Sequence, residues 1–370
     1  MPVKMADKTT VFADDLDSGN EDVDEEFYPV EYRITSYGAD YDVDGLVKRL
    51  KAGDIEVPNF QRSYVWRILE ASRFIESLLL GLPVPAIFLA RDENEKLLVI
   101  DGQQRLRTLQ YFYNGIWAPT GERFDLRRVH SHYQGKTYAT LDDRDRRKLD
   151  NSIMHAIIIR QDGPQEDAPS SVFHIFERLN TGGVRLKPQE IRSAVYHGEL
   201  SSLLSRLNEN ANWRLLIGPV SKDRRDQELI LRFLALLNDG EHYKRPMKEF
   251  LNSFMFQNRH LDQSLSEDRL SEDELSETFE STVEVIAEVI GDDAFKPRKG
   301  LNAALCDAVM VGVAKRLKRG EIKKPETLRT RFEGLLADEK FQAAIATYTT
   351  DEKNVETRLS QAEKAFGRVK

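Results

Sequence analysis

The pattern of apolar residues changes near residue 199, and this change restricts the folds open to the chain. Before it, short apolar runs of strand length alternate with segments whose apolar residues recur every three or four positions, as in helices. After it, helical spacing alone continues, for example in residues 229–237 and 301–313. The sequence therefore predicts an α+β protein, with an α/β domain at about 27–198 followed by an all-helical domain at 199–370.

The α/β domain has its own order of expected elements. Apolar spacing predicts helices at 43–50 and 69–80. Two short apolar runs, 86–90 and 96–100, are separated by a polar stretch and predict a β-hairpin. The same signals predict the remaining elements: helices at 106–113, 173–179 and 188–195, a strand at 153–160, and an irregular segment at 55–66.

Most of the net charge lies at the N-terminus. The formal net charge is −8, and the nine acids and two lysines of residues 1–26 contribute −7 of it. This segment has too few apolar groups to build a core, so we expect a disordered acidic tail, for which one interpretation is a mimic of DNA. The rest of the chain is nearly neutral. Bulk charge therefore does not predict a nucleic-acid-binding protein, and such a function must depend on a local patch.

Composition also predicts the cellular setting. The chain has one cysteine, Cys306, which excludes an internal disulfide and a cysteine-rich zinc site. No apolar run approaches the roughly 18 residues that span a bilayer, and the N-terminus lacks the pattern of a signal peptide. We therefore expect a cytoplasmic protein without a membrane partner.

The segment around Asp101 is the strongest local signal for function. An apolar run at 97–100 leads into Asp101 and Gly102, and a helix is expected to begin near Gln103. Such a turn directs free backbone N–H groups at a ligand above the strand end, as in phosphate sites. Gly102 would let the ligand approach the backbone, and Arg105 could bind phosphate oxygens as a fork. Asp101 would then hold Mg²⁺ or orient water; the alternative is a plain Asp N-cap.

Three motifs in the chain resemble one known family. They are Ile-Asp-Gly-Gln-Gln-Arg at 100–105, Pro-Asn-Phe-Gln-Arg-Ser-Tyr-Val-Trp at 58–66, and the segment 176–186 with its Asn-Thr-Gly-Gly sequence. In their order along the chain, which is 58–66, 100–105 and 176–186, they resemble the N-terminal domain of GmrSD-type restriction endonucleases, which is related in fold to ParB and sulfiredoxin. The resemblance covers about 40–260.

The resemblance implies a nucleotide site. In that family the Asp-Gly-Gln-Gln-Arg element is associated with the binding and hydrolysis of nucleoside triphosphates in support of DNA restriction. It implies catalytic roles for Asp101, Gln104 and Arg105, with Asp101 also a ligand of Mg²⁺. The nucleotide-binding residues expected from the resemblance and the local pattern are Gly102, Gln103, Thr108, Gln61, Arg62, Asn180, Thr181 and Arg185. For the Asn-Thr-Gly-Gly segment, a helix C-cap is an equally good explanation.

DNA contacts are predicted less directly. Basic residues are densest at 123–148, where strands would direct alternate side chains to one face and form a track for phosphates. Tyr64, Arg127 and Arg128 are the candidate DNA-binding residues. Interleaved acids make ordinary ion pairs nearly as good an explanation, and His132 with its neighbour His130 is interpreted as a surface pair. Trp66 is expected to be a buried anchor, with base stacking as the alternative.

Two functions of different classes remain open. No phosphate-binding Gly-x-x-x-x-Gly-Lys-Ser/Thr loop occurs. Relatives with an HNH nuclease need paired histidines, and the candidates His242 and His260 flank a predicted helix at 247–255. The first hypothesis is therefore a Mg²⁺-dependent nucleoside triphosphatase of a restriction or anti-phage system, with the nuclease on a separate subunit. The second is a DNA-binding or nucleotide-gated adaptor without turnover that docks a nuclease partner. The sequence leaves a homo-oligomer open.

Overall fold

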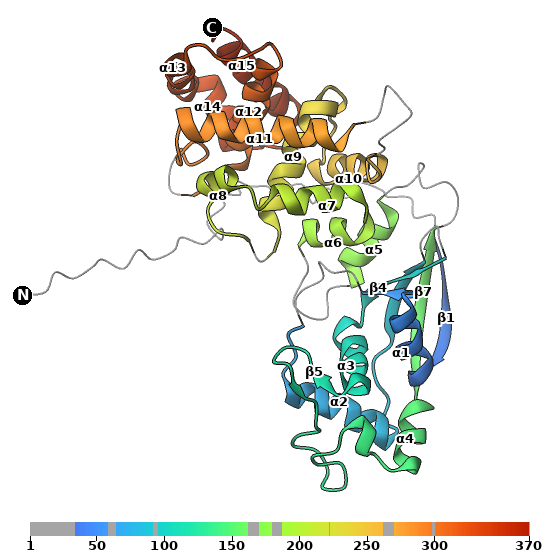
Figure 1. The fold of residues 1–370 in the computed structure, drawn as a ribbon. Helices are drawn as coiled ribbons and strands as arrows, with labels where there is room; N and C mark the ends of the chain where they lie inside the picture. Colours follow the sequence, from blue (N-terminus) through green and yellow to red (C-terminus); the bar gives the residue numbers. More distant parts are fainter. Residues whose placement is uncertain are drawn as a thin grey trace, which may run out of the picture. The chain divides into compact units, whose positions relative to one another are not determined.

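The chain divides into two compact units, Val30–Arg185 and Leu186–Lys370. The computed structural model describes residues 34–57, 64–91, 95–161, 170–179, 187–221, 223–261, 270–297 and 300–369 (Figure 1). The expected acidic tail, 1–26, lies outside these residues. The sequence placed a domain boundary at 198, whereas the division by contacts falls at Arg185. Helix α6, Pro188–Val195, therefore lies in the helical unit.

A five-stranded mixed sheet forms the framework of the first unit (Figure 1). Its strands follow the order β1-β7-β3-β4-β2. They are β1 (Ile34–Asp42), β7 (Ile153–Gln161), β3 (Ile87–Arg91), β4 (Leu97–Asp101) and β2 (Ile55–Glu56). The predicted hairpin is present, because β3 and β4 pair in antiparallel orientation. β7 pairs parallel to β3 and antiparallel to β1.

Strand β1 was not predicted, because its sequence has few apolar residues. It lies at one edge of the sheet, and most of its side chains are exposed. Its nine residues nevertheless pair with β7 along their whole length, from Ile34 opposite Gln161 to Asp42 opposite Ile153. Backbone hydrogen bonds therefore define this strand where side-chain burial does not.

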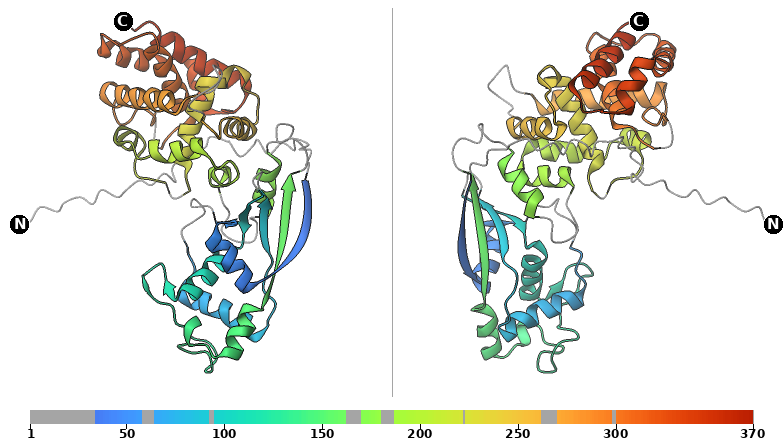
Figure 2. Two further views of the ribbon diagram at one scale, coloured as in Figure 1. Left: turned by 45° about the vertical axis from the view of Figure 1, so that its right-hand side comes forward. Right: turned by 180° about the vertical axis from the view of Figure 1, so that it is seen from behind.

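The core of the first unit lies between the sheet and three helices, which are α1 (Val43–Ala52), α2 (Ile68–Leu80) and α3 (Gln103–Asn114) (Figure 2). Alternate strand residues such as Val99 of β4 and Ile158 of β7 enter this core. Leu106, Leu109 and Phe112 of α3 meet them, each 0% exposed. The spacing of three and four residues along α3 therefore fixes which side of the helix faces the sheet.

The region 123–148 corrects an expectation, because it is not a run of strands. A short ribbon of β5 (Ile116–Trp117) and β6 (Glu122–Arg123) is followed by loops, the 3₁₀ turn η3 (Tyr138–Thr140) and helix α4 (Asp143–Asp150). Asp142 caps α4 by accepting a hydrogen bond from the N–H of Asp145. The acids that interrupt the basic residues therefore start a helix, and no alternating phosphate track forms.

The described residues after the first unit's α5 (Ser171–Leu179) form helices, as the sequence predicted. They are α6, α7 (Glu199–Leu207), α8 (Ala211–Ile217), α9 (Arg225–Asp239), the 3₁₀ turn η6 (Gly240–His242), α10 (Met247–Gln257), α11 (Glu272–Val289), α12 (Ala303–Leu317), α13 (Pro325–Leu336), α14 (Glu339–Ala346) and α15 (Glu352–Phe366). Within the described ranges, we find no helix with the length and apolar character that crossing a membrane requires.

Helix α12 is the central helix of the second unit and carries a buried ion-pair cluster. Asp307 accepts hydrogen bonds from Nε and Nη2 of Arg232 on α9, at 3.1 and 2.8 Å, and from Nη2 of Arg358 on α15, at 2.8 Å. The side chain of Asp307 is 0% exposed. Burial alone would raise the pKa of Asp307, but the two guanidinium groups outweigh it and lower that pKa. The carboxylate thereby links three helices.

Candidate functional site

The predicted strand–turn–helix is present at the junction of β4 and α3 (Figure 1). Strand β4 ends at Asp101, α3 begins at Gln103, and Gly102 between them is the N-cap. Gly102 has φ 102° and ψ 6°, a left-handed conformation, and makes no side-chain hydrogen bond to the first turn. The interpretation of Asp101 as the N-cap is therefore wrong. The positive end of the α3 dipole has no capping carboxylate or hydroxyl on its N-cap residue.

Gly102 is required here by packing. A Cβ atom at this position would lie 3.0 Å from Cβ of Ile87 and closer still to its Cγ2. Carbon atoms in favourable contact are about 3.5–4.0 Å apart. We expected the glycine to leave room for a ligand, but the side chain of Ile87 in β3 fills that room. The positive φ of Gly102 adds a second reason, because side chains disfavour that backbone conformation.

Asp101 is held by Arg105, one turn into α3. Nη2 of Arg105 donates to Oδ2 of Asp101 at 2.8 Å, and its Nη1 donates to the carbonyl of Pro85 at 2.8 Å. The Arg105 side chain is 10% exposed and that of Asp101 is 48% exposed. Burial lowers the pKa of Arg105, and the charge of Asp101 opposes this shift. The guanidinium group that we expected to bind phosphate directly is thus occupied, in this structure, in orienting the Asp101 carboxylate.

Gln104 and Thr108 on α3 hold the segment that leads into α2. Oε1 of Gln104 accepts from the backbone N–H groups of Val65 and Trp66, at 3.0 and 3.2 Å. The Thr108 hydroxyl donates to the carbonyl of Gln104 at 2.7 Å, and its oxygen lies 2.7 Å from the hydroxyl of Tyr64. Because the Thr108 proton is already used, the Tyr64 hydroxyl is the donor in that pair.

Tyr64 and Trp66, the two candidate aromatic contacts, both pack inward. The ring of Tyr64 meets the edges of Tyr111 and Trp117, with centroids 5.0 and 5.2 Å away. Burial raises the pKa of Tyr64 well above its usual range. Trp66 packs against Phe74 of α2 at 5.8 Å, in agreement with its expected role as an anchor. Neither ring is displayed as a platform for a base.

The remaining predicted site residues differ in their exposure and partners, and several lie outside the described residues. Gln103 is half-buried in the first turn of α3. Arg127 binds the Asp125 carboxylate through Nε and Nη2, at 3.3 and 3.1 Å, whereas Arg128 is exposed with φ 54°. Five predicted nucleotide-binding residues lie outside the described residues: Gln61, Arg62, Asn180, Thr181 and Arg185.

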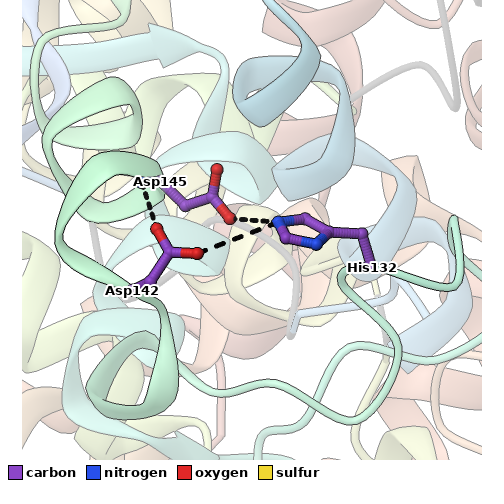
Figure 3. A group of neighbouring side chains, drawn as sticks. All are labelled: His132, Asp142 and Asp145. Carbon is purple, nitrogen blue, oxygen red and sulfur yellow. Dashed lines mark hydrogen bonds and ion pairs between the residues drawn. The ribbon is translucent and has the colours of Figure 1, made fainter.

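The sequence missed one side-chain cluster. The ring of His132 does not simply stand beside His130 on the surface, because its Nε2 faces Asp142 and Asp145 (Figure 3). The sequence did contain a signal for part of this cluster, because Asp142 and Asp145 have the spacing of a helix N-cap and the third residue of its helix. Only the folding of the loop back onto α4, however, brings the histidine to them.

The β4–α3 junction has the parts of a phosphate site. Asp101 offers a half-exposed carboxylate whose Oδ1 has no hydrogen-bond partner among the described residues, and its Oδ2 is fixed by Arg105. The start of α3, whose N-cap Gly102 offers no side-chain cap, lies one residue away. A carboxylate next to helix N–H groups can hold a divalent cation while the helix end attracts an anion.

A comparison with protein-family models finds a match for part of the chain. The family model of the GmrSD restriction endonuclease, N-terminal domain, matches residues 43–197. The matched region runs from the start of α1 past the end of α6 and contains the β4–α3 junction. None of the curated proteins compared with the chain matches it.

Proposed function

Residues 43–197 belong to the family of GmrSD restriction endonuclease N-terminal domains, and from this premise we propose that the chain binds a nucleoside triphosphate and hydrolyses it with Mg²⁺. The family suggests that the chain is a component of a DNA-restriction or defence system. DNA and a nuclease are the partners that the family suggests. The observation that carries the proposal is the pairing of Asp101 with Arg105 beside the positive end of the α3 dipole.

The chemistry follows from what each group at the junction offers. The N-terminal amides and dipole of α3 would stabilise negative charge on a phosphate group. Arg105 would keep the Asp101 carboxylate in one orientation, because its second nitrogen is anchored on Pro85. Gln103, in the same first turn, has an uncharged side chain that we predict to contact the nucleotide.

The residues present fit a magnesium ion. Mg²⁺ in nucleotide sites is commonly bound by one or two carboxylates together with phosphates and water. Asp101 supplies one half-exposed carboxylate with an oxygen that no described residue binds. When bound, the ion would supply positive charge that neutralises the developing charge on the phosphates. Asp101 would hold it through Oδ1, while Oδ2 stays with Arg105.

Two broader proposals accompany this site. We propose that the first unit is related to the ParB and sulfiredoxin fold, which the mixed sheet with a functional turn at a strand end supports. We also propose that the cutting of DNA falls to a nuclease partner. His242 and His260 support this division, since they pair separately with Asp239 and Glu199, at 2.7 and 2.9 Å.

An adaptor without turnover is the second candidate, and a specific observation favours it. Arg105, Gln104 and Thr108, three of the residues assigned to the nucleotide site, are all engaged in hydrogen bonds that hold the fold. A site whose polar side chains are occupied in this way could bind a nucleotide and change the position of the Tyr64–Trp66 segment without hydrolysis.

One experiment separates these functions. Purified protein is mixed with ATP, GTP, CTP or UTP and Mg²⁺, and binding and phosphate release are measured for the wild type, Asp101→Asn and Asp125→Asn. Asp125→Asn is the matched control, since it also alters a carboxylate paired with arginine. We expect Asp101→Asn to lower phosphate release by about 100-fold or more and the control to retain it. Binding without release by the wild type would favour the adaptor, and no binding of any nucleotide would refute both the hydrolase and the nucleotide-gated adaptor.

A further inference from the structure

The loop before α4 brings a histidine to two carboxylates at the surface of the first unit (Figure 3). Nε2 of His132 lies 2.7 Å from Oδ2 of Asp145 and 3.9 Å from Oδ2 of Asp142. The three ligand atoms all lie within 4.8 Å of one another. We propose that His132, Asp142 and Asp145 form a binding site for a divalent transition-metal ion of the Zn²⁺ type. This proposal does not rest on the nucleotide site at Asp101.

The spacing of the atoms suits such an ion. Ligands about 2.1 Å from Zn²⁺ in a tetrahedral site lie about 3.4 Å from one another. The two distances from the histidine nitrogen, 2.7 and 3.9 Å, lie on either side of this value. For these two pairs of atoms, shifts of well under 1 Å would bring the distance to the value of a coordinated pair. One nitrogen and two carboxylate oxygens favour Zn²⁺ or Mn²⁺ over Mg²⁺, which prefers oxygen ligands alone.

The carboxylates are already oriented. Oδ1 of Asp142 accepts the hydrogen bond from the N–H of Asp145 at 2.8 Å, so its Oδ2 is directed at the histidine. The side chain of Asp145 is only 10% exposed, and among the described residues His132 is its one hydrogen-bond partner. A buried carboxylate with a single hydrogen-bond partner gains more from a full positive charge nearby than an exposed one does.

The histidine is held by a closed loop. The N–H of Leu126 donates to the carbonyl of Lys136, and the N–H of Gly135 donates to the carbonyl of Leu126, at 2.9 and 2.8 Å. The N–H of His130 donates to Glu76 of α2 at 2.6 Å, which ties the tip of the loop to the core. The ion would therefore join two segments that are each already fixed, so that little ordering cost opposes binding.

Lys136 is the natural competitor for this position. Its Nζ lies 3.8 Å from Oδ2 of Asp142, where its positive charge partly neutralises the carboxylate. An incoming cation has to displace it or accept its repulsion. Removal of this charge should therefore strengthen metal binding, an effect of opposite sign to that of removing a ligand.

Calorimetric titration of tag-free full-length protein with Zn²⁺, without nucleotide, tests the proposal. We expect one ion per chain, and His132→Asn should weaken binding by at least the roughly 10–100-fold that loss of an outer-shell partner costs. His155→Asn is the matched control, because His155 pairs with Asp40 at an exposed site where the described residues supply no third ligand. Lys136→Gln should tighten binding.

The outcomes divide clearly. The proposal is supported if Zn²⁺ binding is weakened in His132→Asn, unchanged in His155→Asn and tighter in Lys136→Gln. Since His132 is half-exposed, its variant should fold, and Lys136→Gln gives a second test that does not depend on losing binding. Absence of Zn²⁺ binding in the wild type, or equal binding in the wild type and His132→Asn, would overturn the proposal.

Discussion

Substitution of Gly102 by alanine tests why the turn beneath the candidate site has its sequence. The new Cβ would lie 3.0 Å from Cβ of Ile87, inside van der Waals contact, and the backbone would keep φ 102°. Overpacking of this kind costs about 1–3 kcal/mol, and a left-handed conformation costs an L-residue about 1–2 kcal/mol. We therefore expect Gly102→Ala to lower the unfolding free energy of the first unit by about 2–5 kcal/mol.

Gly115→Ala is the matched control at the other end of the same helix. Gly115 has φ 71°, but, apart from its own chain neighbours, no described residue has an atom within 4 Å of the position of its absent Cβ. Gly115→Ala should therefore lower the unfolding free energy only by the cost of the left-handed backbone conformation, about 1–2 kcal/mol. The difference between the two variants isolates the contact with Ile87.

Amide hydrogen exchange of peptides from β3 and β4 measures the effect in the first unit alone. Each 1.4 kcal/mol corresponds to about tenfold faster exchange when amides open with the unit. In the double variant Gly102→Ala, Ile87→Ala, the two costs should be less than additive by about 0.5–3 kcal/mol, because the second change removes Cγ2 of Ile87. Equal costs for Gly102→Ala and Gly115→Ala, or full additivity in the double variant, would refute the packing argument.

Three further predictions follow from other parts of the molecule. Gln104→Leu removes the acceptor of two backbone N–H groups, so their exchange should become about tenfold faster, whereas Gln110→Leu on the same helix should leave it unchanged. Burial is the largest of the effects that raise the pKa of Tyr138 from 10.0 to about 12. The protonated phenol therefore stabilises the folded state fully below pH 10, and this stabilisation is lost as the pH rises to 12. Over this range the unfolding free energy of Tyr138→Phe should fall less than that of the wild type, and parallel curves of unfolding free energy against pH would contradict the assignment. Asp307→Asn removes the carboxylate charge that two buried guanidinium groups share and should cost the helical unit about 3–5 kcal/mol in urea unfolding, against less than about 1 kcal/mol for the exposed Glu333→Gln.

Local patterns predicted the elements that bury one face. The hairpin of β3 and β4, the helices α1 to α3 and the helical second unit follow from apolar spacing and from glycines at helix ends. Strand β1 could not be recognised in this way, since it pairs through its backbone at the sheet edge and buries few side chains. The basic stretch at 123–148 misled the strand prediction because the charges alternate as in a strand, while the capping by Asp142 starts a helix.

The candidate site shows where sequence reasoning ends. The motif identified the strand–turn–helix correctly, but the partners of its residues lie 15 to 44 positions away in the chain. Arg105 donates a hydrogen bond to Pro85, Gln104 accepts one from Val65, and Gly102 packs against Ile87. None of these contacts produces a recognisable pattern in the local sequence. The chemistry of a motif could thus be predicted from residue types, whereas the division between residues that hold the fold and residues open to a ligand required the folded chain.

The most direct test of the nucleotide site is to locate binding by amide hydrogen exchange. Wild-type protein is compared with and without Mg²⁺ and a non-hydrolysable analogue of the nucleotide that binds. Binding at the β4–α3 junction predicts slower exchange in peptides that contain the first turn of α3, with this protection lost in Asp101→Asn. Protection elsewhere with none at the junction, or protection that Asp101→Asn leaves intact, would contradict the assignment of Asp101 and the start of α3 to nucleotide binding.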